Sequence, residues 1–167
     1  AGNNNIFFNA LADETYDNCT ISVDNNSNTS DNLSVSSFTI DTTPPTLVET
    51  TVVPSFTNDN ATQYTFSSTE GGTISIGGSC SSDNNTAVAD NMTVSFAALA
   101  DGTYSDCTIT VTDSSGNTQT ISVNTFTIDT VKPVLAQVIA VTTPTNDNTT
   151  LSYTFSSTEA GTINYGG

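Results

Sequence analysis

Carboxylates and cysteines are the side chains of this sequence that could do chemistry. The 167 residues include 17 Asp and Glu, a single Lys, no Arg and no His, for a formal net charge of −16. Without histidine the commonest general base is missing, so we expect no enzyme. Converging carboxylates can bind Ca²⁺, and pairs among the three cysteines can form a disulfide. The shortage of cations argues against binding to nucleic acid or to an anionic membrane surface.

An internal repeat determines which elements position these residues. LADETYDNCTISV at 11–23 returns as LADGTYSDCTITV at 99–111, a displacement of 88 residues. A unit of that length matches one small domain. We therefore expect the C-terminal half of one unit at 1–42, a complete unit at 43–130 and the N-terminal half of another at 131–167. The longest apolar runs are far shorter than the roughly twenty residues that cross a bilayer, so we expect no membrane insertion in this segment.

Within the complete unit, apolar and polar residues alternate in short segments separated by turn sequences such as STEGG, ALADG and DSSGN. Period two predicts half-buried β-strands, and several of them in under ninety residues favour an antiparallel sandwich. Tyr104 follows the LADG turn and precedes Cys107 by three residues, which is similar to the tyrosine corner of immunoglobulin-like (Ig-like) domains. We therefore predict an all-β fold of tandem Ig-like β-sandwich domains. The step of three from Val123 to Phe126 predicts a bulge in the last strand.

This topology predicts where the cysteines lie and which of them can pair. TISIGG and CTITV would be the neighbouring strands C and F, which places Cys80 and Cys107 at the same end of the sandwich. We predict a disulfide between them, which would put the protein outside the cytoplasm; two unpaired thiols are the alternative. Cys19 is the repeat counterpart of Cys107, and its expected partner falls before residue 1.

Four stretches carry a resemblance to a known family. FTIDTTPPT closes a unit, YTFSSTEGGTI lies in its first half, LADGTY precedes a strand and TVTDSSGN contains the next turn. Together they resemble the bacterial Ig-like repeats that build the stalks of large secreted adhesins and surface fibres. The resemblance implies a spacer role, with many copies stacked end to end at the cell surface.

The junctions between units collect carboxylates. The linkers DTTPP and DTVKP are short and stiffened by proline, so we expect consecutive units to stand in line. Loops from both neighbouring domains would bring Asp and Glu side chains to each linker, where they could bind Ca²⁺. The resemblance to adhesin repeats implies the same use of such ions to stiffen junctions. The alternative is that these are ordinary turn and capping residues. The candidate ligands are Asp13, Glu14, Asp41, Glu70 and Asp113 at the first junction, and Asp59, Asp101, Asp129 and Glu159 at the second.

The favoured function is a structural spacer or filament-forming repeat of a large extracellular bacterial protein. Its partners would be adjacent Ig-like repeats, either along one longer chain or in separate chains that complete one another head to tail. A carbohydrate- or surface-binding adhesin module is the alternative, with Tyr165 and Phe56 as candidate exposed aromatics, although Phe56 could instead anchor a loop. Ice binding is a third hypothesis and depends only on the outward threonines of TITVT.

Overall fold

The central part of the chain forms a two-layered β-sandwich. The computed structural model describes residues 2–166, and every regular element in that range is a strand, which confirms the predicted all-β class. The central strands are β5 (Leu47–Thr51), β6 (Phe56–Thr57), β7 (Gln63–Ser68), β8 (Gly72–Gly77), β9 (Thr86–Ala87), β10 (Asp90–Ser95), β11 (Gly102–Tyr104), β12 (Thr108–Thr112), β13 (Thr118–Ser122) and β14 (Phe126–Ile128).

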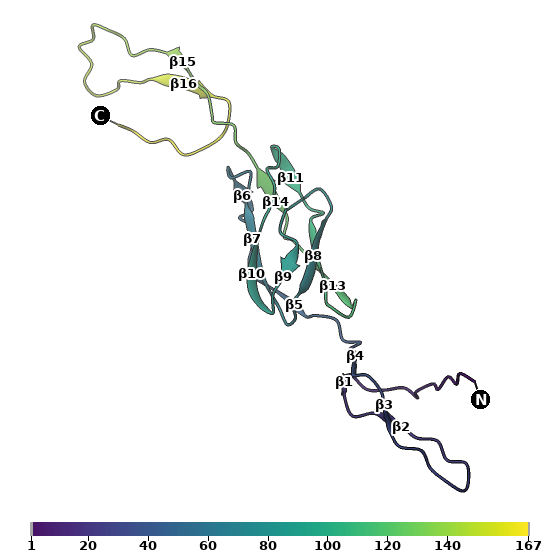
Figure 1. Ribbon diagram of the computed structural model, residues 1–167. Coiled ribbons are helices and arrows are strands. Elements are labelled where there is room, and N and C mark those ends of the chain that lie inside the picture. Colours follow the sequence, from purple (N-terminus) through teal and green to yellow (C-terminus); the bar gives the residue numbers. More distant parts are fainter. Residues whose placement is uncertain (1, 167) are drawn as a thin grey trace.

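Each layer has the strand order of an Ig-like sandwich. One layer is ordered β10–β7–β5, and the other contains the sheet β13–β12–β8–β9 and the shorter sheet β11–β14–β6 (Figure 1). Pairing is antiparallel except between β14 and β6, which run parallel. The last strand is interrupted between β13 and β14, where a bulge is predicted. There the Asn124 side chain accepts from the Val53 N–H at 3.0 Å and donates to the Val53 carbonyl at 2.7 Å, so these backbone groups stay paired.

The core is built by the predicted alternation. Tyr64 and Phe66 in β7 and Ile109 in β12 are fully buried, while the residues between them face outward or are half-buried. The Phe126 ring lies 6.2 Å from that of Phe96 and 5.3 Å from that of Tyr104, measured between ring centroids. Burying each of these large side chains contributes about 1.5–3 kcal/mol to folding.

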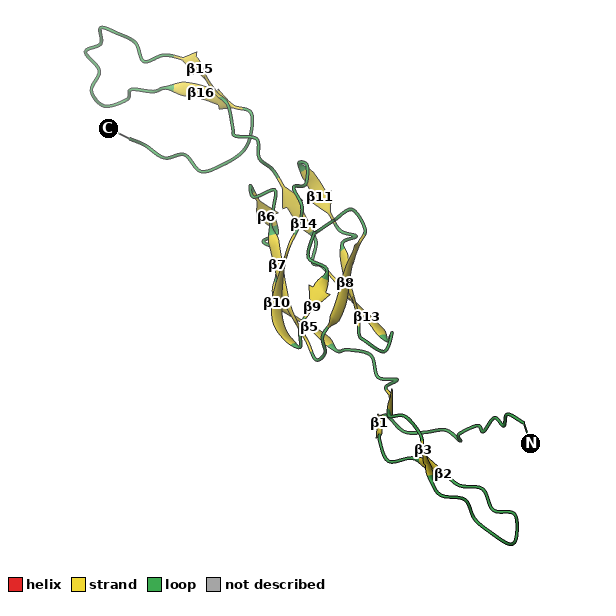
Figure 2. Ribbon diagram, in the orientation of Figure 1, coloured by secondary structure: helices red, strands yellow, loops and turns green. Residues whose placement is uncertain are grey.

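The two segments that the repeat predicts to be partial units flank the central sandwich at opposite ends (Figure 1). They contain little regular structure, as Figure 2 shows. In the first unit β1 pairs with β4 and β2 with β3, whereas in the last unit β15 pairs with β16. Their bounds are β1 (Glu14–Tyr16), β2 (Thr20–Ile21), β3 (Leu33–Ser34), β4 (Phe38–Ile40), β15 (Leu135–Ile139) and β16 (Thr154–Ser157).

No helix within residues 2–166 has the length and hydropathy needed to cross a membrane.

Candidate functional site

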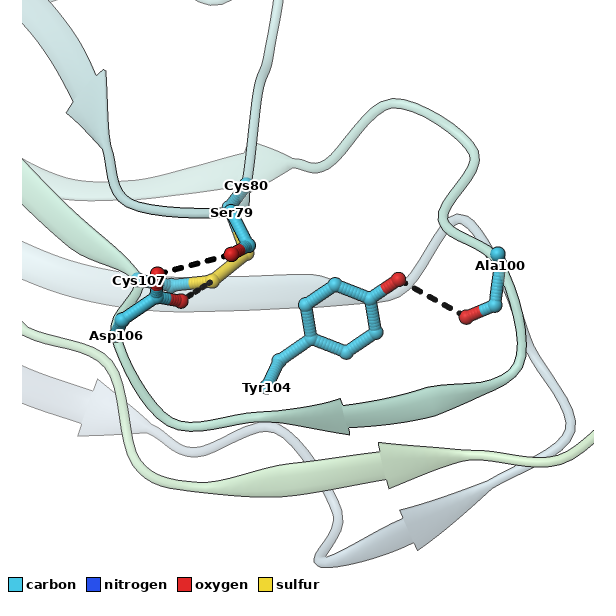
Figure 3. The surroundings of a disulfide bond; sticks show 6 residues. All are labelled: Ser79, Cys80, Ala100, Tyr104, Asp106 and Cys107. Atoms are coloured by element: carbon cyan, nitrogen blue, oxygen red, sulfur yellow. Dashed lines mark hydrogen bonds between the residues drawn. A yellow bond between two sulfur atoms is a disulfide. The ribbon is translucent and has the colours of Figure 1, made fainter.

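A disulfide joins Cys80 and Cys107, whose Cα atoms lie 5.4 Å apart (Figure 3). Strands β8 and β12 are antiparallel neighbours with Ile76 opposite Ile109, so a cysteine after the first strand meets one that precedes the second. Both cysteines are buried. Beside them the Ser79 hydroxyl donates to Asp106 at 2.9 Å and lowers the pKa of that carboxyl. Cys19 is a free thiol.

The tyrosine corner has a purely structural role. The Tyr104 hydroxyl donates to the Ala100 carbonyl at 3.0 Å (Figure 3). The Tyr104 ring stacks on that of Phe126. In the first unit Tyr16 repeats this bond to Ala12 at 3.1 Å. The tyrosine therefore fastens the loop before the strand to the core in both units.

The first linker is held from below by Asp13. The Thr42 N–H and hydroxyl donate to Asp13 at 3.0 and 2.9 Å, and the Thr43 hydroxyl donates at 2.8 Å. The bond from the Thr42 N–H, followed by those from the two hydroxyls, lowers the pKa of the Asp13 carboxyl. The same device recurs at the second linker, where the Thr130 N–H and hydroxyl donate to Asp101 at 3.1 and 2.9 Å.

The first linker is also held from above by Asn117, in the loop between β12 and β13. The Asn117 side-chain amide donates to the Asp41 carbonyl at 3.2 Å and to Asp113 Oδ2 at 2.9 Å. Asp113 Oδ1 in turn accepts from the N–H groups of Ser115 and Asn117 at 2.8 and 2.9 Å. The linker is thus hydrogen-bonded to the unit before it and to the unit after it.

Three of the predicted metal ligands converge at this junction. Asp41 belongs to the linker, Glu70 follows β7 and Asp113 follows β12, and they offer carboxylate oxygens within 4.8 Å of one another. Asp113 is buried and the other two are half-buried. Burial, and then the charges of Asp41 and Asp113, raise the pKa of Glu70. Burial opposes ionisation of Asp113 as well, but the hydrogen bonds from Asn117, Ser115 and Gly116 keep its pKa below the ordinary value.

The other six predicted ligands do not join this group. Asp13 and Asp101 hold linker threonines, while Asp59 and Asp129 accept from the N–H groups of Ala61 and Val131 two residues later. These four carboxylates accept hydrogen bonds from backbone N–H groups, as the alternative hypothesis of turn and capping residues expects. Within residues 2–166 no second group of three carboxylates forms, and the repeat counterpart of Asp113 for the second junction falls beyond residue 167. Glu14, in β1, and Glu159, after β16, likewise lie outside the group.

Two features of the junction are absent from the sequence predictions. Thr42 and Asn117 hold the linker from either side, although neither belongs to the candidate set. A signal for the threonine was present, since DT follows the last strand of both units and LAD precedes the tyrosine in both. Phe56 is also misjudged as a loop anchor, because its side chain is 81% exposed.

Comparison with known proteins assigns the central sandwich. Residues 50–130 match the family model described as Bacterial Ig-like domain. No curated protein and no solved structure matches the chain. Domains of this kind commonly occur in surface or extracellular proteins and are typically non-enzymatic. The match covers the last two residues of β5 and all strands from β6 to β14, and it confirms the predicted Ig-like sandwich. Residues 50–130 are therefore similar to a bacterial Ig-like domain.

Proposed function

We propose that the chain is a spacer segment of a large extracellular bacterial protein, a stalk or surface fibre in which Ig-like units stand in line. The observation that carries this proposal is the double attachment of the first linker. Asp13 of the preceding unit accepts from Thr42 and Thr43, and Asn117 of the following unit donates to the Asp41 carbonyl. A tether that allowed free rotation would have to break these bonds each time the units reoriented.

The chemistry of the central domain agrees with a passive role. The disulfide and the tyrosine corner stabilise the domain, and no His is present to act as a base. Disulfides persist in oxidising compartments, which supports the extracellular placement of the spacer. We therefore expect no catalytic activity from the chain.

Calcium is the second part of the proposal. Asp41, Glu70 and Asp113 supply hard oxygen ligands, which suit Ca²⁺. Burial first, and then the negative charges of Asp41 and Asp113, raise the pKa of Glu70, and a bound divalent cation would offset that repulsion. Since Asp41 lies in the linker and the other two in the following domain, a cation there would add a third attachment across the junction.

Small-angle scattering of the full chain tests the spacer role. The comparison is a variant with flexible Gly-Ser residues inserted after Thr43, and a second with Asp13→Ala and Asn117→Ala. We expect the unmodified chain to have the larger radius of gyration and the narrower distribution of distances. If the unmodified chain scatters like the Gly-Ser variant, the linker is a flexible tether and the spacer role is wrong.

A matched pair of variants tests calcium binding. Glu70→Gln removes one member of the carboxylate group, whereas Glu159→Gln makes the same change at the repeat counterpart, where no such group forms. In isothermal titration calorimetry we expect Glu70→Gln to weaken Ca²⁺ binding at least tenfold and Glu159→Gln to leave it unchanged. Equal loss in both variants, or no binding by the unmodified chain, would remove calcium from the proposal and leave the hydrogen-bonded linker intact.

A surface-binding module is the second candidate function, because Phe56 exposes 81% of its side chain on a complete domain. Tyr165 is 94% exposed but belongs to a partial unit. Its counterpart in the complete domain, Ile76, packs against the core. Carbohydrate sites usually present exposed aromatics. Binding of the chain to a glycan array, lost on Phe56→Ala, would favour this candidate over the spacer.

A further inference from the structure

The strands beside the two linkers cross the central domain in the same direction. β5 and β6 follow the first linker and β13 and β14 precede the second, and Figure 1 shows the two linkers at opposite ends of the domain. β6 and β14 pair in parallel, with Phe56 opposite Thr127 and Thr57 opposite Ile128. A pull on the two ends of the chain therefore slides these strands past one another along their own direction.

Two backbone hydrogen bonds resist this sliding. The Thr127 N–H donates to the Ser55 carbonyl at 2.9 Å, and the Asp129 N–H donates to the Thr57 carbonyl at 3.0 Å. Bonds between parallel strands are evenly spaced and lie across the strands, so a pull along the strands loads them together. They must break almost at once, whereas the bonds of a hairpin that is opened from one end break one at a time.

Asn124 strengthens the same connection at the interruption of the last strand. Its side chain bonds both backbone groups of Val53, at 3.0 and 2.7 Å. Val53 is fully buried, and a hydrogen bond shielded from water is stronger than an exposed one. Backbone and side chain together therefore join the first and last strands along segments 53–57 and 124–129, which we call the terminal joint.

The other ladders of the domain carry the pull only after the terminal joint has opened. β5 also pairs with β7, through a ladder that is irregular between Glu49 and Thr51. Separation of β5 from β7 would free only residues before Val53 and would leave the joint closed. The ladders β7–β10 and β8–β12 connect strands that do not adjoin either linker. The terminal joint is therefore the part that must fail before the sandwich can unfold under tension.

The disulfide lies outside the terminal joint and closes the segment 80–107, which contains β9, β10 and β11. Once the joint has opened, the chain on either side of this segment can extend, but the 27 positions that separate the two cysteines cannot. At about 3.6 Å per extended residue, and with the cysteine Cα atoms held 5.4 Å apart, the cross-link withholds about 90 Å of extended chain.

We propose that the central domain is a mechanical element of the chain. The terminal joint bears tension along the chain, and the disulfide limits how far the domain lengthens after the joint has opened. The use of this device rests on the spacer role, because only a segment that connects two distant points carries tension. The strength of the joint, in contrast, belongs to the central domain and is measured without reference to that role.

Magnetic tweezers test the proposal on the full chain, held through its two ends at constant force. Cys19→Ala serves as background, so that the free thiol cannot react with the handles. Asn124→Ser removes the amide that bonds Val53 and introduces the residue that the first unit carries at this position, Ser36. Chemical denaturation shows that each variant is folded and how much stability it has lost.

Asn84→Ser is the matched control, because it makes the same substitution outside the terminal joint. The Asn84 side-chain oxygen accepts from the Ser95 N–H at 3.1 Å and lies 3.1 Å from the Ser82 hydroxyl oxygen. These contacts hold the edge of β10, which lies inside the segment closed by the disulfide. Loss of stability there should have little effect on the rate at which the joint opens.

At a force that unfolds the background chain slowly, Asn124→Ser should raise the unfolding rate about tenfold, because two hydrogen bonds of the joint are missing. Asn84→Ser should leave the rate within about twofold of the background. The dependence of the rate on force should correspond to a barrier about 3 Å away, the length of a hydrogen bond, because the bonds of the joint break together. Reduction of the disulfide, carried out on unfolded protein, should add about 90 Å to the unfolding step.

The proposal fails if Asn124→Ser unfolds at the rate of the background, or if Asn124→Ser and Asn84→Ser raise the rate equally, because the barrier then lies outside the terminal joint. A force dependence that corresponds to tens of ångströms would also overturn it, since the strands would then peel apart one pair at a time. Unfolding steps of equal length before and after reduction would mean that the disulfide does not limit extension. A flexible linker in the scattering experiment would leave all of these results unchanged, so failure of the spacer role is distinguishable from failure of the joint.

Discussion

Breaking the disulfide between Cys80 and Cys107 is expected to lower the stability of the central domain by about 3.5 kcal/mol. The two cysteines are separated by 27 residues. Closing a loop of that length removes roughly 12 cal/mol/K of entropy from the unfolded chain, which corresponds to this free energy at 25 °C. For a domain of this size the entropy of unfolding is about 2.1 cal/mol/K per residue, so the melting temperature should fall by about 20 °C.

Differential scanning calorimetry of oxidised and reduced protein measures this difference. Reduction is carried out on unfolded protein, because both cysteines are buried in the folded domain. A Cys19→Ala background prevents exchange with the free thiol. Comparing two redox states of one chain keeps both sulfurs in the core, so the difference reports the cross-link rather than the cavities that alanine substitutions would create.

The result that would refute this reasoning is a reduced chain that melts within about 3 °C of the oxidised one. The cross-link would then not constrain the unfolded chain as its loop length requires. Comparing the oxidised background chain with the unsubstituted protein provides the control. Cys19 lies in the first unit, so its substitution should leave the transition of the central domain unchanged.

Three further outcomes follow from the geometry. Tyr104→Phe should cost about 1 kcal/mol in chemical denaturation, because it removes one hydrogen bond and keeps the ring stacking; an unchanged midpoint would contradict this. Gly78→Ala should destabilise the domain far more than Gly116→Ala. Both glycines have positive φ, but a Cβ at Gly78 would lie 2.1 Å from the Asp106 carbonyl oxygen, whereas one at Gly116 would meet nothing within 4 Å. Equal melting temperatures of the two variants would contradict this expectation. In EDTA, Glu70→Gln should melt higher than the unmodified chain at pH 7, because a raised pKa means that the folded state disfavours ionised Glu70. This difference should shrink as the pH falls through the raised pKa towards the ordinary value of 4.5, and a lower-melting Glu70→Gln at pH 7 would contradict the assignment.

Periodicity made the fold and the covalent geometry accessible from sequence. The repeat fixed the unit, and alternation placed residues such as Tyr64, Phe66 and Ile109 in the core, where all three are buried. Once the strands containing Ile76 and Ile109 are known to be neighbours, the pairing of Cys80 with Cys107 follows from their positions at the adjacent ends of those strands. These inferences succeed because the side-chain period of a strand and the strand order of a sandwich are set by the backbone, and both leave a direct trace in the order of apolar residues.

The roles of the carboxylates were much less accessible. A loop aspartate can bind a nearby backbone N–H or turn towards a neighbouring domain, and the choice depends on side-chain rotation that leaves no periodic signal. Asp59 and Asp129 bind a backbone N–H two residues later, whereas Asp13 reaches the linker and Glu70 reaches the carboxylate group at the junction. Sequence could bring candidates to the correct end of the domain, but the converging three are fixed only by the loop conformations.

Comparing the repeated units shows which contacts recur at both linkers and which occur at the first one alone. Asp13 and Asp101 hold linker threonines at both junctions, so this attachment belongs to the repeat itself. Asp113, in contrast, corresponds to Asn25 in the first unit, whose Oδ1 accepts from two backbone N–H groups of its turn as Asp113 does. In the first unit the turn is held by this amide oxygen together with the Asp24 carboxylate, which accepts from the Asn26 N–H and the Thr29 hydroxyl. Under the spacer proposal, alignment of the units would depend first on the aspartate–threonine attachment that recurs at both linkers, and a cation held by Asp41, Glu70 and Asp113 would add to it at the first junction.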